Sequence, residues 1–172
     1  MTASKKLTPR QIKAEIARLQ RRLRGSAKHS RALERAIEQV DPDLDPAVWK
    51  EAFESEDPEV MNRVMAVTGA YSALINNYFE ILRASTRTVG VVSGRRPTVD
   101  TTLDAVKGSP GLTGDQASLV YELYGTEGRM EHISPTITAE EVRDAIIRLR
   151  ENLPGLIEAA LAWLEEHDLK LT

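Results

Sequence analysis

The first forty residues carry apolar and small side chains at a helical period. A capping box that begins at Thr8 is predicted to start a helix. Apolar or small side chains then recur at alternating spacings of three and four residues, as in a heptad seam that one helix presents to another. The seam consists of Ile12, Ile16, Leu19, Leu23, Ser26, Ser30, Leu33, Ile37 and Val40. Gly25 and the two serines weaken its middle, so the segment is expected to form either one bent coiled-coil helix or a short helical hairpin.

Three Asp-Pro pairs, at 41–42, 45–46 and 57–58, divide the chain after this segment. Residues 41–46 cannot continue a helix, because each of their two prolines lacks an amide hydrogen and disfavours helical geometry in the residue before it. The pair at 45–46 is predicted to begin a short helix, and the pair at 57–58 a helix of about thirty residues. The predicted parts are a basic helical arm at 1–40, a linker with a short helix at 41–57 and a helical bundle at 58–172.

Three shorter helical patterns follow the long one. A helix is predicted over 98–107, a second from a capping box at Thr113, and a third from a capping box at Thr138. Residues 125–137 are predicted to be irregular because they contain two Gly and a Pro. Pro154 is expected to kink the last helix without ending it, since the apolar period resumes beyond it. No strand pattern is present, so the predicted fold class is all-α.

Asn76 and Asn77 interrupt the apolar period of the long helix. Two interpretations of this pair remain open at this stage. The side chains donate hydrogen bonds to neighbouring helices, or they lie at the edge of a helix face.

The charge of the chain is unevenly distributed. The 172 residues include 23 Lys and Arg and 26 Asp and Glu, for a net charge of -3. Residues 1–40 hold eleven of the basic residues and three of the acidic ones, so the arm is at +8 and the remainder at -11. Two interpretations fit the arm: it contacts nucleic acid electrostatically, or it docks on the acidic body of its own or a partner subunit. The scarcity of aromatic residues in the arm argues against base stacking on single strands. The candidate nucleic-acid-binding residues are Arg18, Arg21, Arg22, Arg24 and Lys28.

Composition excludes several classes of site. The chain has no Cys, which removes disulfides, thiolate zinc sites and Cys nucleophiles. No two of the three His residues have a metal-ligand spacing, and no phosphate-binding or dinucleotide-binding glycine motif occurs, so neither a metal nor a cofactor is expected. No apolar run is long enough to span a bilayer, and the first residues have no secretory signal pattern. A cytoplasmic location without a membrane partner is therefore expected.

The segment 119–138, LVYELYGTEGRMEHISPTIT, followed by an amphipathic helix with LPGLI at 153–157, resembles the C-terminal half of HEPN domains. These are helical bundles named for higher eukaryote and prokaryote nucleotide-binding proteins, and the resemblance loosely covers residues 58–168. Known members include metal-independent ribonuclease toxins and non-catalytic relatives, and they are commonly dimeric. Their signature is an Arg, often followed by Asn, with a His about five residues later, at the end of a helix.

This chain keeps half of the HEPN signature. His132 matches the His, but Glu127 and Gly128 stand where Arg and Asn are expected. The resemblance implies that His132 would move protons at the ribose, with Arg129 as a substitute phosphate ligand, in a metal-independent endoribonuclease. A Glu in place of the Arg puts negative charge beside a polyanion, which disfavours catalysis. Whether the chain is an enzyme therefore stays open.

The expected function is that of a nucleic-acid-associated, HEPN-like homodimer of the toxin–antitoxin or phage-defence type, with ribonuclease activity weak or lost. The alternative is a non-catalytic interaction or dimerisation protein without a nucleic-acid role, whose arm binds a protein partner. A third interpretation is a domain that binds a small nucleotide near His132.

Overall fold

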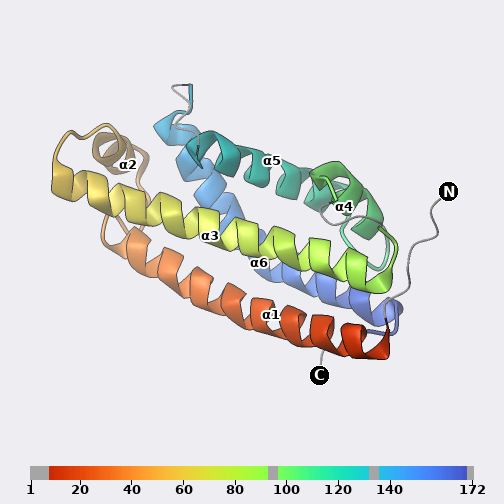
Figure 1. The fold of residues 1–172 in the computed structure, drawn as a ribbon. Helices are drawn as coiled ribbons and strands as arrows, with labels where there is room; N and C mark the ends of the chain where they lie inside the picture. The colour runs from red at the N-terminus through yellow and green to blue at the C-terminus, as the bar shows by residue number, and fades with distance from the viewer. Residues whose placement is uncertain (1–7, 93–96, 132–135, 170–172) are drawn as a thin grey trace. The chain divides into compact units, whose positions relative to one another are not determined.

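The computed structural model of the chain describes residues 8–92, 97–131 and 136–169. These residues form six α-helices with no strand among them, so the predicted all-α class is confirmed (Figure 1). The helices are α1 (Pro9–Glu38), α2 (Pro46–Phe53), α3 (Pro58–Val89), α4 (Val99–Val106), α5 (Gly114–Glu131) and α6 (Ala139–Glu166).

The helix starts follow the predicted capping chemistry. At α1, the backbone N–H of Thr8 donates to Gln11 Oε1 at 2.8 Å, and the N–H of Gln11 donates to the Thr8 hydroxyl at 3.4 Å. The boxes that begin at Thr113 and Thr138 make the same reciprocal pair of bonds before α5 and α6. Asp45 caps α2 through its carboxylate, which accepts from two backbone N–H groups. Local sequence is therefore sufficient to place these helix starts.

The chain forms two compact units. Unit 1 contains residues up to 25, 77–121 and 153 onward, and unit 2 contains residues 26–76 and 122–152. Four helices, α1, α3, α5 and α6, contribute residues to both units, whereas α4 belongs to unit 1 and α2 to unit 2.

In unit 1, the first half of α1 packs against α3. Leu19 has no exposed surface and forms a buried cluster with Ile81 and Ala84 of α3, against which Leu23 also packs (Figure 1). Trp163 of α6 is buried in the same unit. The N-terminal helix is thus part of the core of unit 1.

In unit 2, the second half of α1 also supplies core residues. Leu33 and Ile37 are buried, as the predicted seam requires. Trp49 of α2 is fully buried, and its indole N–H donates to the carbonyl of Ala139 at 2.8 Å. This bond satisfies the polar end of a large apolar side chain and fixes α2 to the start of α6.

The two asparagines of α3 donate interhelical hydrogen bonds, which decides between the two interpretations of the pair. In unit 2, Asn76 Nδ2 donates to Glu127 Oε1 of α5 at 2.9 Å. In unit 1, Asn77 Nδ2 donates to the backbone carbonyl of Arg22 in α1 at 3.0 Å. Adjacent residues of one helix therefore connect it to two others.

Two buried tyrosines of α3 make similar connections. Tyr71 donates its hydroxyl hydrogen to the carbonyl of Leu123 at 2.7 Å in unit 2, and Tyr78 donates to the carbonyl of Leu156 at 2.9 Å in unit 1. Burial raises the pKa of both hydroxyls well above the ordinary value of 10. Both phenols therefore stay protonated and remain donors.

The hairpin alternative for the first forty residues is wrong, because α1 is one helix. The small residues in the middle of the seam serve packing. Gly25 faces Asn77, the side chain that reaches the Arg22 carbonyl, and a Cβ on the glycine would lie 3.6 Å from Asn77 Oδ1, an ordinary van der Waals distance. Ser26, the next residue, is buried.

The prediction of an irregular segment over 125–137 is wrong for its first half, because α5 continues to Glu131. Two glycines lower the helix propensity of this turn, but a long-range bond outweighs that effect. Glu127 is only 5% exposed and accepts a hydrogen bond from Asn76, which is 51 residues away in the sequence. The sequence pattern does not contain this contact.

The last helix continues through Pro154 to Glu166, in agreement with the resumed apolar period. None of the described helices is both long and apolar enough to cross a lipid bilayer.

Candidate nucleic-acid interface

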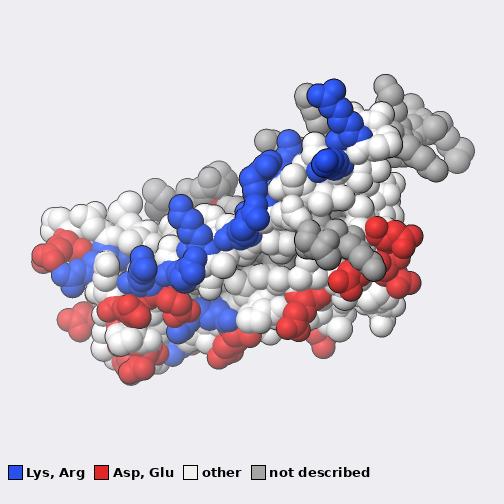
Figure 2. Space-filling model, turned by 90° about the horizontal axis from the view of Figure 1, so that it is seen from below, with Lys and Arg blue, Asp and Glu red and all other residues white. Residues whose placement is uncertain are grey.

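The side of α1 that faces away from the buried seam is basic. Seven Lys and Arg side chains on it are exposed, and at about 100° per residue their positions fall within an arc of about 80° opposite Leu19 and Leu33. Figure 2 shows Lys and Arg side chains gathered along this helix. The residues are Arg10, Lys13, Arg21 and Arg24 in unit 1 and Lys28, Arg31 and Arg35 in unit 2. We call these seven residues the basic face of α1.

The cations of the basic face are available for a ligand. None of the seven forms an ion pair or side-chain hydrogen bond with another residue in the described ranges. Between Lys13 and Arg35 no acidic residue of α1 is exposed. In unit 1 the potential at this surface is therefore positive and is not neutralised by acids of the same helix, whereas in unit 2 Glu38 is exposed at the end of α1.

Of the five nucleic-acid-binding residues predicted from the arm, three belong to the basic face and two do not. Arg21, Arg24 and Lys28 belong to the basic face. Arg18 pairs with Glu15 at 2.8 Å, and its position lies outside the arc. The other departure from the prediction is Arg22, which is half-buried, lies 3.6 Å from Glu80 and supplies a carbonyl to Asn77.

Four residues of the basic face were missed by the sequence reasoning: Arg10, Lys13, Arg31 and Arg35. Their signal was available in the spacing. Each lies about half a helical turn from the seam. Plotting the Lys and Arg positions around the helix axis together with the seam therefore identifies these four as outward-facing, and it excludes Arg22.

The candidate catalytic pair is only partly described. His132 lies outside the described residues. Arg129, in the last turn of α5, pairs with Glu141 of α6 at 2.9 Å, so its charge is already compensated within unit 2. The backbone N–H of Thr138 and, to a lesser extent, the Arg129 guanidinium lower the pKa of Glu141. Glu141 therefore stays ionised at neutral pH and keeps its bond to Arg129.

Glu127, at the position of the signature Arg, is a structural residue of unit 2. It is 5% exposed and accepts the hydrogen bond of Asn76. Its negative charge also contributes, after burial, to the raised pKa of Tyr71, while Arg148 acts in the opposite direction. A buried acid tied to α3 cannot take the phosphate-binding role that the signature gives to Arg.

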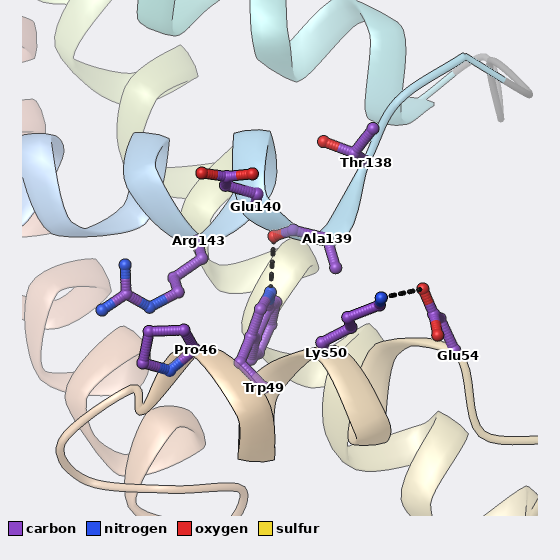
Figure 3. A pocket seen from close by; sticks show the side chains of 8 residues that line it. All are labelled: Pro46, Trp49, Lys50, Glu54, Thr138, Ala139, Glu140 and Arg143. Carbon is purple, nitrogen blue, oxygen red and sulfur yellow. Dashed lines mark hydrogen bonds and ion pairs between the residues drawn. The ribbon is translucent and has the colours of Figure 1, made fainter.

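A cavity of about 510 Å³ in unit 2 lies between α2 and the start of α6 (Figure 3). Its cations already have partners: Lys50 lies 4.0 Å from Glu54, and Arg143 donates to the Leu44 carbonyl and to Asp144. The residues that line it are Pro46, Trp49, Lys50, Glu54, Thr138, Ala139, Glu140 and Arg143. With two acids, two paired bases and a Trp whose ring is fully buried, the cavity does not select an anionic ligand.

Within the described part of the chain, no group of three or more His, Asp or Glu side chains is arranged to hold a metal ion. Comparisons with family models, with curated proteins and with solved structures found no match to the chain.

Proposed function

We propose that the chain is a nucleic-acid-binding protein of the toxin–antitoxin or phage-defence type, HEPN-like in its fold, with ribonuclease activity weak or lost. The observation that carries the proposal is the basic face of α1, with seven exposed cations that have no acidic partner in the described residues. Unpaired cations at helical spacing are what a phosphate backbone requires, because phosphate contacts supply most of the affinity of such proteins.

The experiment is a titration of labelled RNA and DNA with the full chain, followed by fluorescence anisotropy at increasing salt. If all seven cations contact phosphates, log K falls against log salt with a slope of up to about -6. The variant Arg21→Glu plus Arg24→Glu should bind at least tenfold more weakly. Deleting residues 1–40 is not a usable test, because it removes Leu19 and Leu33 from the core.

A matched control carries the same change of net charge elsewhere. Arg63 and Arg148 are exposed arginines outside α1, each paired with a glutamate. The variant Arg63→Glu plus Arg148→Glu should retain affinity within a few fold. If the control loses as much affinity as the α1 variant, or if wild-type protein binds no nucleic acid at low salt, the proposal is wrong.

Weak or absent ribonuclease activity is supported by the state of the signature residues. Arg129 is compensated by Glu141, and the residue in place of the usual Arg is a buried acid. Incubating RNA with wild-type protein and His132→Ala in the presence of EDTA should give equal, background cleavage. Strong cleavage that is lost in His132→Ala would contradict this part of the proposal.

One observation supports a contact surface, which both the expected homodimer and the alternative, a non-catalytic interaction or dimerisation protein, require. On the first turns of α3, Met61 is 45% exposed and Met65 is 65% exposed, and Gly69 continues the same stripe. Exposed methionines on a helix face are typical of contact surfaces. Homodimerisation through this stripe predicts a dimer in light scattering that becomes a monomer in Met65→Glu, while Ser118→Glu on α5 leaves it unchanged.

A further inference from the structure

The exposed surface of α1 consists of very few kinds of side chain. From Lys13 to Arg35, every exposed residue of this helix is Lys, Arg or Ala. The alanines are Ala14, Ala27 and Ala32. The helix contains no Phe, Tyr or Trp at any position.

This composition argues against single strands as the ligand. Proteins that hold single-stranded nucleic acid combine a positive groove with aromatic rings on which bases stack. The basic face of α1 has the charge but no ring. Its cations can reach phosphates but offer the bases no surface to stack on.

The same composition limits readout of base edges to guanine, which Arg and Lys can pair with. No exposed Asn or Gln lies between Lys13 and Arg35 to form a bidentate pair with adenine. Contacts from Lys and Arg to phosphates fix the position of a protein on a duplex without reading its sequence.

The shape of the face favours a B-form duplex. An α-helix with its side chains is about 10–12 Å wide, and the major groove of B-DNA is about 12 Å wide. In A-form RNA the major groove is narrow and deep, and side chains cannot read it. Alanines at both edges of the basic face keep the profile of α1 low there, while Lys and Arg extend to the phosphates.

We infer that the basic face of α1 binds double-stranded B-form DNA, mainly through its phosphates. The inference rests on the proposed function and names its ligand class. A lipid surface is disfavoured, because amphipathic helices bind membranes by burying their apolar side in lipid, and the apolar side of α1 is buried in the protein by Leu19 and Leu33.

The experiment compares four labelled probes of one base sequence: double-stranded DNA, double-stranded RNA, single-stranded DNA and single-stranded RNA. Anisotropy titrations with the full chain should give the tightest binding to double-stranded DNA, by tenfold or more over each other probe. An unlabelled DNA duplex of unrelated sequence but equal G·C content should compete about as well as the labelled sequence itself.

Variants connect the preference to the helix. Arg21→Ala plus Arg24→Ala removes two of the cations and should reduce the salt slope for duplex DNA by about 1.8, because each phosphate contact contributes about 0.9. The control Arg63→Ala plus Arg148→Ala removes the same charge and should leave the slope unchanged. Circular dichroism of both variants checks that the helices persist.

The outcomes separate this inference from the proposed function. Equal binding to all four probes, or tighter binding to RNA, overturns the inference and leaves the proposed function in place. A preference for duplex DNA that the α1 variant does not weaken also overturns it. If no probe binds, both fail.

Discussion

Replacing Leu19 by Ala tests whether α1 is part of the core. Leu19 has no exposed surface, and it packs with Ile81 and Ala84 of α3 in unit 1. A Leu→Ala change in such a site removes buried apolar surface and leaves a cavity, which costs about 2–5 kcal/mol. We expect about 3 kcal/mol, because partly buried Leu23 lies against the cluster and can fill some of the space.

The magnitude converts into a measurable change in melting temperature. For a chain of this size, 1 kcal/mol corresponds to about 2–4 °C, so Leu19→Ala should lower the midpoint by about 6–12 °C. Circular dichroism during heating, and urea titration for the free energy of unfolding, are the assays. Arg21→Ala is the control on the exposed side of the same helix, and it should change stability by no more than about 0.5 kcal/mol.

The refuting result is a midpoint for Leu19→Ala that equals that of wild type and of Arg21→Ala. That result would mean that α1 folds as a separate arm and that its seam is free for another protein. It would also restore deletion of residues 1–40 as a usable test of nucleic-acid binding.

Three further predictions concern single side chains. Gly111→Ala should destabilise the fold by more than about 2 kcal/mol in a thermal melt, since φ is +141° and the added Cβ would lie 2.4 Å from the Val106 carbonyl oxygen. Glu127→Leu should cost about 1–3 kcal/mol in urea titrations because it leaves Asn76 without its acceptor, whereas Glu127→Gln, which keeps an acceptor oxygen, should cost less; equal losses would contradict this role. Glu141 has a pKa lowered below 4.5, so its contribution to stability is present above that pH and is lost as the pH falls through the lowered value. The melting temperature of Glu141→Gln should accordingly fall less than that of wild type on acidification through this range.

Elements with local determinants could be predicted from the sequence. The capping boxes at Thr8, Thr113 and Thr138 involve residues three positions apart, and all three are present in the structure. The apolar period also carries through Pro154, where a local rule alone would end the helix. These features depend on spacing within one segment, which a sequence displays completely.

The missed features depend on contacts between distant segments. The extension of α5 through Gly125 relies on Glu127, whose partner Asn76 is 51 residues away. The same kind of contact places Gly25 against α3, since a Cβ on it would be in ordinary van der Waals contact with Asn77. In both cases glycine was interpreted as a helix breaker because its partner could not be known from its neighbours in sequence.

The candidate site shows a related limit. Charge counting found the basic segment, but it could not separate Arg22, which contacts α3 residues, from Arg21, which faces outward. Adjacent positions on a helix differ by about 100°, so one of two neighbouring arginines can serve the fold while the other serves a ligand. The position of the buried seam shows which side of the helix faces the core, and therefore which arginines face outward.

The presence or absence of a carboxylate partner distinguishes the Lys and Arg side chains that stabilise the fold from those that are available to a ligand. In the segment that resembles the HEPN signature, Arg129 is held by Glu141, and Glu127 stands where that signature has Arg. A phosphate that approached Arg129 would have to displace a carboxylate that Thr138 also holds ionised, whereas one that approached Arg21 or its neighbours on the basic face meets no paired carboxylate in the described residues. Competition by an internal acid costs affinity, so the cations that bind a polyanion first are those without such an acid. By this reasoning, any nucleic-acid role of the chain belongs to α1 before it belongs to the signature, and a loss of binding in Arg129→Ala that exceeds the loss in Arg21→Ala would show the reasoning to be wrong.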